Sequence, residues 1–371
     1  MRTTRRRTFA QVTGLLLALA ILAAGCGDDG AADGDGDGDG ELRPFTMMFP
    51  VQDPIQFYPW YLAEELGYLE EEGLDVTLEA ADGSSGAIQQ LIAGNADAAL
   101  PAPGAFLTGV ASGQPLKWIY SLQYSNIFTL VARADAGISS VADLSGKRVG
   151  VSELSGGEVP LVRAVLRDAG LSEGQDVELV PVGEGSALTI EALESGQVDA
   201  YSSSVFDIAA IEAAGVELSV ILPEDAAGYP ADGVVTSEET LSSRHDDLVG
   251  FLRAASKAIV FAAANPEAAL EILAEVAPEA FEDEDLARRF FEVSTNLTTP
   301  PAELSGQPTG SHNLAGFQEY HDFLLQGSEE EGALPEPVDL GVALDDSLLE
   351  EANDFDRAAV EEEAANYSGD A

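Results

Sequence analysis

Cysteine and histidine are scarce in this chain of 371 residues. Cys26 is the single cysteine, which excludes a disulfide, a redox pair or a cysteine-based metal site within the chain. The three histidines, His245, His312 and His321, form no His-Glu-x-x-His motif, and no Gly-x-Ser-x-Gly elbow occurs. Carboxylates are abundant, but no two of them stand out as a glycosidase pair. We therefore expect no enzyme activity, no metal and no cofactor.

Basic residues are also few. Lysine and arginine number 17 against 66 aspartates and glutamates, a formal charge of −49. Four of the 17 lie in residues 1–25, so a chain cleaved there keeps 13 and carries a formal charge of −53. Such a surface repels nucleic acid and anionic lipid, so we expect neither as a partner surface. It also opposes compaction unless salt screens the charges.

The apolar stretch at residues 12–24 is too short to cross a membrane as a helix. It follows four arginines, which is typical of an export signal, and we assign residues 1–25 to a signal peptide. Residues 22–26, Leu-Ala-Ala-Gly-Cys, resemble a bacterial lipobox, although the leucine stands four residues before Cys26 where three is usual. Residues 6–9 resemble a twin-arginine signal, so the export route stays open. We expect Cys26 to be lipidated and to anchor the chain to the cell membrane on its extracytoplasmic face.

Residues 27–40 alternate aspartate and glycine with low complexity. They imitate the start of an EF-hand loop, but the carboxylate required at its twelfth position is missing. We expect residues 26–41 to be a flexible, self-repelling linker with a reach of about 20 Å.

The rest of the chain contains one internal repeat. The first copy, residues 73–98, returns as residues 174–200, offset by 101 residues at its start and 102 at its end. Each copy reads as a strand with period-two alternation, a turn, a helix and a second strand that opens on Asp-Ala. A glycine after each helix suits a left-handed cap. The pattern predicts two α/β lobes, each with a parallel strand pair, whose strand ends form a ligand crevice.

Several polar turns follow these predicted strands. The Gly-Ser turn of the first copy places Ser84, Ser85 and Gly86 at the start of a helix, facing the crevice. The loop after the expected first strand, residues 45–49, supplies further candidates: Gln52, Asp53, Phe57, Tyr58 and Trp60. The three aromatic rings suit a planar ligand. The alternative, that these rings pack a helix against the sheet, stays open.

Three stretches resemble one family. Residues 141–151 are similar to the Asp-Leu-x-Gly-Lys-x-Val-Gly-Val signature of substrate-binding proteins of ABC importers. Residues 58–80 resemble the opening helix and strand of the NMT1/THI5-like group, the nitrate, sulfonate, taurine and thiamine-precursor branch. The repeated Leu-x-x-Gly-x-x-Asp-Ala is typical of the same group. The resemblance covers roughly residues 43–355. Within it we expect a helix over residues 61–69 and, as in the family, a closing strand at residues 335–340.

This resemblance implies a periplasmic-binding-protein-like (type II) bilobal α/β fold with two crossings between its lobes. Ser155, Gly156 and Gly157 correspond to a ligand-contacting loop at a helix start, where free backbone N–H groups bind anions or carbonyl oxygens. In this arrangement residues 201–204, at the end of the second repeat, face the crevice, as do residues 100–103, their counterpart in the first repeat. Hydroxyls there suit a polar ligand, and Tyr124 lies near the hinge. The remaining candidates are therefore Tyr201, Ser202, Ser203, Pro103 and Tyr124.

We expect lobe 1 to comprise residues 42–130 and 233–355, lobe 2 residues 131–232, and an acidic, loose tail residues 356–371. The predicted function is that of a monomeric extracytoplasmic solute-binding lipoprotein that delivers a small solute to an ABC permease. The solute is either a pyrimidine or thiamine-precursor-like heterocycle or a sulfonate or nitrate-type anion. Two alternatives stay open: a pyrimidine-precursor synthase-like enzyme, and a ligand-sensing lipoprotein without transport.

Overall fold

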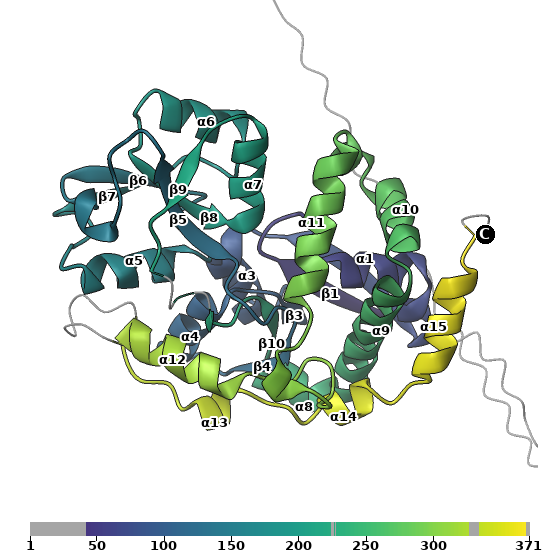
Figure 1. Cartoon of the computed structure of the whole chain (residues 1–371). Helices are drawn as coiled ribbons and strands as arrows, with labels where there is room; N and C mark the ends of the chain where they lie inside the picture. Colours follow the sequence, from purple (N-terminus) through teal and green to yellow (C-terminus); the bar gives the residue numbers. More distant parts are fainter. Residues whose placement is uncertain (1–41, 224–225, 227, 326–333, 369–371) are drawn as a thin grey trace, which may run out of the picture. The chain divides into compact units, whose positions relative to one another are not determined.

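A computed structural model describes residues 42–223, 226, 228–325 and 334–368 (Figure 1). The predicted signal peptide, Cys26 and the predicted linker lie outside the described residues. The first crossing between the two predicted lobes, most of the second crossing and nearly all of both lobes lie within them.

The first sheet has a mixed topology. Among the described residues it contains five strands in the order β2-β1-β3-β10-β4. β1 pairs in parallel with β2 and β3, and β10 pairs antiparallel with β3 and β4. Its strands are β1 (Arg43–Phe49), β2 (Leu74–Ala80), β3 (Ala98–Ala99), β4 (Leu116–Ser121) and β10 (Gly233–Ser237).

The second sheet repeats that topology. Its five described strands follow the order β7-β6-β8-β5-β9, with β6 parallel to β7 and β8, and β5 antiparallel to β8 and β9. β6, β7 and β8 thus take the places of β1, β2 and β3, so the predicted duplication of a strand–helix–strand unit is confirmed. Its strands are β5 (Phe128–Arg133), β6 (Lys147–Val151), β7 (Val177–Pro181), β8 (Ala200–Ser204) and β9 (Leu218–Val220).

The repeated residues fold the two units by the same local contacts. Asp97 accepts a hydrogen bond from the backbone N–H of Thr46 at 2.8 Å, and Asp199 accepts one from Arg148 at 2.9 Å. Each aspartate therefore ties the end of its unit to the neighbouring parallel strand, β1 in the first sheet and β6 in the second. The glycines after the two helices, Gly94 and Gly196, have φ of 73° and 71°, the left-handed conformation that was predicted for them.

Helices cover both faces of each sheet (Figure 1). Those packed with the first sheet or following it are α1 (Tyr58–Glu65), α2 (Tyr68–Glu71), α3 (Gly83–Ile92), α4 (Pro103–Ala111), α8 (Glu238–Ser243), α9 (His245–Ala264), α10 (Pro266–Val276), α11 (Glu284–Leu297), α12 (Leu314–Leu325), α13 (Leu340–Ala343), α14 (Leu349–Ala352) and α15 (Arg357–Asn366). Those of the second sheet are α5 (Val159–Asp168), α6 (Ala187–Glu194) and α7 (Val205–Ala213). Short 3₁₀ turns are η1 (Val141–Leu144), η3 (Pro278–Phe281) and η4 (Ala302–Leu304).

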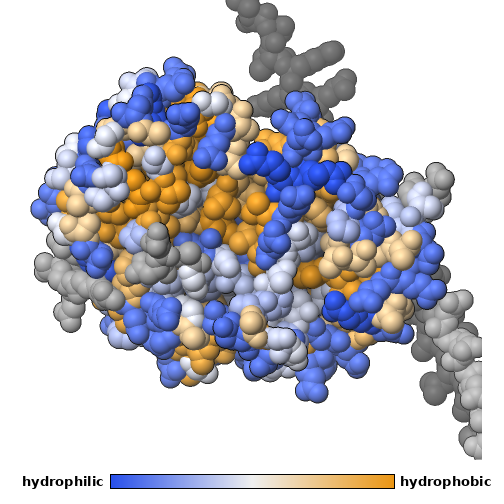
Figure 2. All heavy atoms as spheres, in the orientation of Figure 1, coloured by the Kyte–Doolittle hydropathy of each residue, from blue (hydrophilic) through white to orange (hydrophobic). Residues whose placement is uncertain are grey.

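Alternation along the strands divides the core. Phe45, Met47 and Phe49 of β1 face α1 and α9, whereas Met48 faces α3 and α4. This is the period of two that a strand imposes on side chains. The core around Met48 continues into α5 and the second sheet, so both sheets share one apolar layer. On the outside, α11 buries Ala287 and Phe291 and presents hydrophilic side chains to solvent, as Figure 2 shows.

Three expected elements differ from the structure. The helix expected over residues 61–69 is interrupted at Gly67, whose φ of 75° ends α1 before α2 begins. The closing strand expected at residues 335–340 is absent from the described residues there; instead Leu344 forms a single bridge with Trp118. The expected loose tail contains α15, because Val360 and Ala364 lie one turn apart and pack into the core beside α9.

The chain passes between the sheets twice. It leaves the first sheet after Ser121 and enters the second at Phe128; it leaves the second after Val220 and returns at Gly233. The predicted lobe boundaries, at 130/131 and 232/233, stay a prediction. The first of them would divide β5, which lies wholly within the second sheet.

Candidate functional site

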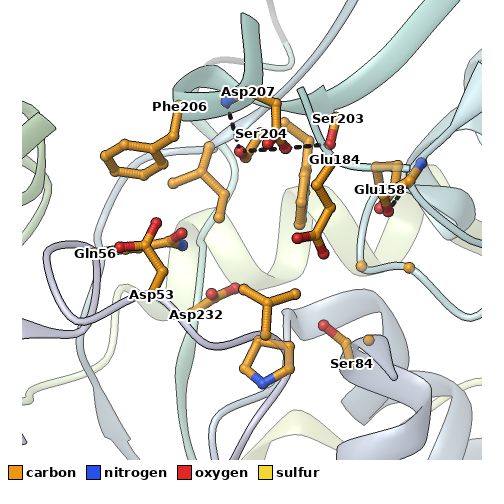
Figure 3. A pocket seen from close by; sticks show the side chains of 18 of the residues that line it. Asp53, Gln56, Ser84, Glu158, Glu184, Ser203, Ser204, Phe206, Asp207 and Asp232 are labelled. Carbon is orange, nitrogen blue, oxygen red and sulfur yellow. Dashed lines mark hydrogen bonds between the residues drawn. The ribbon is translucent and has the colours of Figure 1, made fainter. Parts of the chain in front are cut away.

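A pocket lies between the two sheets, where strands from both of them end (Figure 3). The loops after β1, β6 and β8 contribute to it, as does the start of α3. These loops follow the carboxyl ends of parallel strands, the usual place for ligands in open α/β sheets. The cavity measures about 100 Å³, room for several water-sized groups, which suits a small molecule.

The lining is acidic. Its carboxyl groups come from both lobes and from the second crossing, and none of the lining residues is lysine, arginine or histidine. Phe128, Phe206 and Ile127 supply apolar surface between them. The acidic residues are Asp53, Glu153, Glu158, Glu184, Asp207 and Asp232.

Burial makes these groups weaker acids than usual. Desolvation raises the pKa of Glu158, Glu184 and Asp232 to about 7 in each case. Burial also raises the pKa of Asp53 and of Asp207. The negative charge of Asp207 contributes to the raised pKa of Asp53, Glu158 and Glu184. These carboxyls are therefore protonated more readily than exposed ones, and a positive ligand beside them would favour their charged form.

Three of the carboxylates are fixed by donors from their own loops. Asp53 accepts the backbone N–H groups of Ile55 and Gln56 at 3.0 and 2.9 Å. Glu158 accepts both the N–H and the hydroxyl of Ser152, at 2.9 and 2.6 Å.

Asp207 accepts the hydroxyls of Ser203 and Ser204, and Ser204 in turn caps α7 through the Asp207 N–H at 3.2 Å. The three carboxylates are thus held in place before any ligand arrives.

Asp232 has no such support. Its side chain is buried, and its Oδ1 has no hydrogen-bond partner in the part of the chain that the structure describes. Its backbone carbonyl accepts the N–H groups of Leu122 and Gln123, at 3.1 and 3.0 Å, which joins the second crossing to the first. The group therefore lies at the hinge with free capacity to accept a hydrogen bond.

The turn of the first repeat touches the loop after β6. Ser155 donates its hydroxyl to the carbonyl of Asp82 at 3.0 Å and accepts the N–H of Ser85 at 3.2 Å. Gly83 and Gly157 permit this approach. A Cβ on Gly157 would lie 2.7 Å from both the Ser84 Oγ and the Phe128 ring. The two lobes are thus in direct contact beside the pocket.

The structure brings six of the sequence-predicted residues into the pocket lining. They come from the loop after β1, the start of α3, the loop after β6 and the end of β8. Of the others on these loops, Ser85 and Ser155 make the contact between the lobes, and Gly86 follows within α3. The six are Gln52, Asp53, Ser84, Gly156, Gly157 and Ser203.

The three predicted aromatic residues lie in the core instead. Phe57 stacks on Phe49 with 5.0 Å between ring centroids, and Trp60 stacks on Phe251 at 5.7 Å. The hydroxyl of Tyr58 bonds that of Thr298 at 3.0 Å. All three are at most 1% exposed, because α1 lies between the sheet and α9, α10 and α11 and is buried all round at its start. These three rings therefore pack α1 into the core, which is the alternative that the sequence left open.

Four further predicted residues are buried and bonded to backbone or core. Tyr124 accepts the N–H of Gly310 on its hydroxyl at 3.1 Å. Tyr201 donates its hydroxyl to the Gly183 carbonyl at 2.8 Å, and Ser202 donates to that of Thr129 at 2.8 Å. Pro103 begins α4 and is buried there. None of these four is among the residues that line the pocket.

Sequence reasoning missed most of the acidic lining. Among 66 carboxylates, neither charge nor spacing distinguishes Glu184 or Asp232. Asp207 carried a weak signal, since Ser204 three residues before it has the spacing of a helix cap. Glu158 follows Gly156 and Gly157, so the sequence predicted the loop in which it lies but did not predict its side chain as part of the site.

The sequence matches the family model described as NMT1/THI5 like over residues 54–269, more than half of the chain. The chain belongs to the NMT1/THI5-like family. The predicted family resemblance is confirmed.

Two relatives of this NMT1/THI5-like protein are named as binding proteins. The riboflavin-binding protein RibY of Chloroflexus aurantiacus is 26% identical over 242 residues, covering 64% of this chain and 68% of RibY. The formylaminopyrimidine-binding protein of Halalkalibacterium halodurans is 25% identical over 344 residues, covering 89% of this chain and 99% of the relative. The predicted solute-binding class is confirmed.

Solved structures share its fold. The alkanesulfonate-binding protein SsuA of Xanthomonas axonopodis pv. citri, bound to MOPS, has a TM-score of 0.62 at 18% identity, covering 83% of this chain and all of SsuA. The desulfurization enzyme DSZB has a TM-score of 0.52 at 19% identity, covering 83% and 98%. The expected periplasmic-binding-protein-like fold is confirmed. Because an enzyme shares it, the fold alone does not separate binding from catalysis.

Within the described residues, no helix combines the length and the apolar character needed to cross a membrane. The same residues hold no group of three or more histidine, cysteine, aspartate or glutamate side chains placed to bind a metal ion.

Proposed function

We propose that this NMT1/THI5-like protein is an extracytoplasmic solute-binding lipoprotein that captures a small organic solute and delivers it to an ABC permease. The observation that carries the proposal is the pocket whose lining comes from both sheets and from the crossings between them. A ligand held there contacts both lobes at once. Such a ligand favours the closed arrangement of the lobes over the open one.

The contact between the lobes supports a capture mechanism. Ser155 and Ser85 join the loops of opposite lobes beside the pocket, so closure covers a bound molecule with backbone groups from both sides. On opening, these few polar bonds exchange with water, and the apolar layer that both sheets share separates between the lobes. Delivery to a permease requires such reversible opening.

The lining favours a heterocycle over a sulfonate or nitrate. Six carboxyl groups and no cation face the cavity, so an anionic ligand would meet unfavourable potential from every side. A nitrogen heterocycle with N–H groups donates hydrogen bonds to the same oxygens, and Phe128 and Phe206 offer flat apolar surface for its ring. The names of the riboflavin- and formylaminopyrimidine-binding relatives agree with that class.

We assign the binding site to residues that present polar atoms or rings to the cavity. From the sequence predictions we retain Gln52, Asp53, Ser84, Gly156, Gly157 and Ser203. To these we add seven further residues of the cavity lining: Gln56, Phe128, Glu158, Glu184, Phe206, Asp207 and Asp232.

A thermal-shift screen of the purified protein tests this function. We expect aminopyrimidines or related nitrogen heterocycles to raise the melting temperature, and taurine, alkanesulfonates and nitrate to leave it unchanged. Recovery of the heterocycle unaltered after incubation, checked by mass spectrometry, supports binding without catalysis. Stabilisation by the sulfonates alone, or chemical conversion of the heterocycle, would contradict the proposal.

The anchor is tested separately. We propose that Cys26 is lipidated after cleavage of residues 1–25 and that residues 26–41 tether the folded part to the membrane. We expect Cys26→Ser to move the protein from the membrane fraction to the soluble extracytoplasmic fraction, because the chain then has no lipid. Unchanged fractionation of the variant would argue against the lipid anchor and would leave the solute-binding proposal intact.

A further inference from the structure

Asp232 differs from Asp53, Glu158 and Asp207, the three carboxylates of the pocket whose hydrogen bonds are described above. It is 2% exposed and lines the cavity, yet its Oδ1 has no hydrogen-bond partner among the described residues. Asp53, Glu158 and Asp207 each accept two hydrogen bonds from their own loops. An unpaired buried acceptor is costly, and a charged one more so. Its presence inside a binding pocket points to a donor supplied by the ligand.

Asp232 lies at the hinge between the lobes, so a ligand donor bound to it would contact the hinge. Its backbone carbonyl accepts the N–H groups of Leu122 and Gln123, so the residue joins the two chain crossings. Gln123, on the first crossing, also has buried side-chain atoms, Oε1 and Nε2, without a hydrogen-bond partner among the described residues. The polar groups of the hinge are therefore incompletely satisfied within the protein.

Other negative groups surround the same space. In Figure 3 the side chains of Asp232 and Ser84 point into the cavity from one side and Glu184 points in from the other. Asp53 and Asp207 lie on the remaining sides, and Phe128, Phe206 and Ile127 supply apolar surface. No lining residue in the described part of the chain is lysine, arginine or histidine, so this lining supplies no compensating charge to the cavity. Carboxyl groups between apolar surfaces favour a positive group, beside which they ionise and which they then attract.

We propose that the solute is an organic cation with at least one N–H donor, and that Asp232 is its counter-ion and the specificity-determining residue of the pocket. The ligand class is that of a protonated amine, amidine or amino-substituted heterocycle small enough for the cavity. This inference rests on the solute-binding function proposed above. Asp232 accepts the ligand N–H, and Phe128 and Phe206 contact the ring that carries it.

Charge-matched probes test the inference. Benzamidinium, benzamide and benzoate share one shape and carry charges of +1, 0 and −1. An aminopyrimidine bearing an aminomethyl, hydroxymethyl or carboxylate substituent repeats the series on a second ring. Isothermal titration at neutral pH would measure each affinity for the wild-type protein. We expect the cation of at least one series to bind about tenfold or more tightly than its neutral member, and the anion not to bind.

Single substitutions test whether the preference for cations depends on Asp232. We expect Asp232→Asn to weaken cation binding about 30-fold or more while leaving the affinity for the neutral member nearly unchanged, since the amide keeps the shape but loses the charge. Glu158→Gln should weaken it less, because Ser152 already occupies that carboxylate. Asp75→Asn, on the exposed side of β2, is the matched control and should bind like the wild type.

The outcomes separate the two proposals. If neutral or anionic members bind as tightly as the cations, or if Asp232→Asn binds the cation normally, the cation inference is wrong while solute binding stands. If Mg²⁺ or Zn²⁺ alone binds at the pocket in competition with the cations, the ligand is a metal ion and the inference is also wrong. If no probe of either series and no compound of the heterocycle screen binds, the solute-binding function fails as well. Circular dichroism of each variant excludes misfolding as the cause.

Discussion

Asp97 and Asp199 illustrate how much a single side chain can specify locally. Each stands at the same place in its repeat, and each accepts the backbone N–H of a residue in the neighbouring parallel strand, β1 or β6. The carboxylate accepts an N–H of β1 or β6 just before β3 or β8 begins, where the strand ladder offers no acceptor for it. This contact recurs in both lobes because it needs only neighbouring strands. For that reason Asp97 and Asp199 could be found in the sequence as equivalent positions of the repeat.

Asp232 is the opposite case, and it gives a prediction on stability. Burial raises the pKa of its carboxyl from 3.8 to about 7 in the folded chain. The folded state therefore binds a proton that the unfolded state has released, and stability falls as pH rises between about 4 and 7. We expect Asp232→Asn to match the wild type near pH 4 and to exceed its free energy of unfolding by up to about 4 kcal/mol at pH 8 without ligand.

Urea denaturation at several pH values measures this difference. The other carboxyls around the pocket whose pKa is raised, Asp53, Glu158, Glu184 and Asp207, titrate in both proteins and cancel in the comparison. Asp75→Asn serves as the exposed control and should show no pH-dependent gain. A variant that is less stable than the wild type at pH 8 would show that Asp232 has a stabilising partner within the protein.

At the scale of elements, the two glycine-bearing turns decide how closely the lobes approach. The turn at the start of α3 and the loop after β6 meet without intervening side chains at Gly83 and Gly157. A Cβ on Gly157 would lie 2.7 Å from Ser84 Oγ, a group of the opposite lobe, and 2.8 Å from the Cβ of Ala102. Neither neighbour can retreat easily, because both are buried.

We therefore expect Gly157→Ala to weaken ligand binding by roughly tenfold or more, since overpacking at this contact costs about 1–3 kcal/mol in the closed arrangement. The ligand-free thermal stability should change much less if the lobes separate to accommodate the methyl group. Titration calorimetry with a stabilising ligand from the screen measures the loss. Gly228→Ala is the control, because a Cβ there meets no atom within 4 Å. Equal affinities of the two variants would mean that the loops do not close on the ligand.

At the scale of the whole molecule, charge dominates. The chain carries 66 acidic and 17 basic residues, and the described basic side chains are largely paired with carboxylates of the surface, such as Arg244 with Asp97 and Arg253 with Glu72. The remaining acidic groups repel one another in the folded state. Their repulsion weakens when salt shortens the screening length.

Raising the NaCl concentration from about 0.05 to 1 M should therefore increase the melting temperature, by about 3–8 °C. Differential scanning calorimetry in NaCl and in KCl at equal ionic strength checks the effect, and the two salts should act alike. A melting temperature that is constant or falls with salt would show that surface repulsion contributes little to the stability of this protein.

Much of the fold could be predicted because local patterns determine it. The duplicated strand–helix–strand units, the left-handed glycines after their helices and the family signature at residues 141–151 each depend on residues close in sequence. The loops that end at the pocket were predicted for the same reason, since they follow recognisable strands. Residues such as Ser84, Gly157 and Ser203 belong to them.

Only the tertiary structure decided which side chains of those loops face the cavity. The rings of Phe57, Tyr58 and Trp60 pack into the core because α9, α10 and α11, encoded about 200 residues later, close over α1. Asp53, Asp207 and Asp232 meet in one pocket because three distant strand ends converge there. Short stretches of sequence determine local hydrogen bonding and the period of burial, so these can be predicted. Which residues line a pocket depends on packing between distant segments, so no short stretch of sequence predicts it.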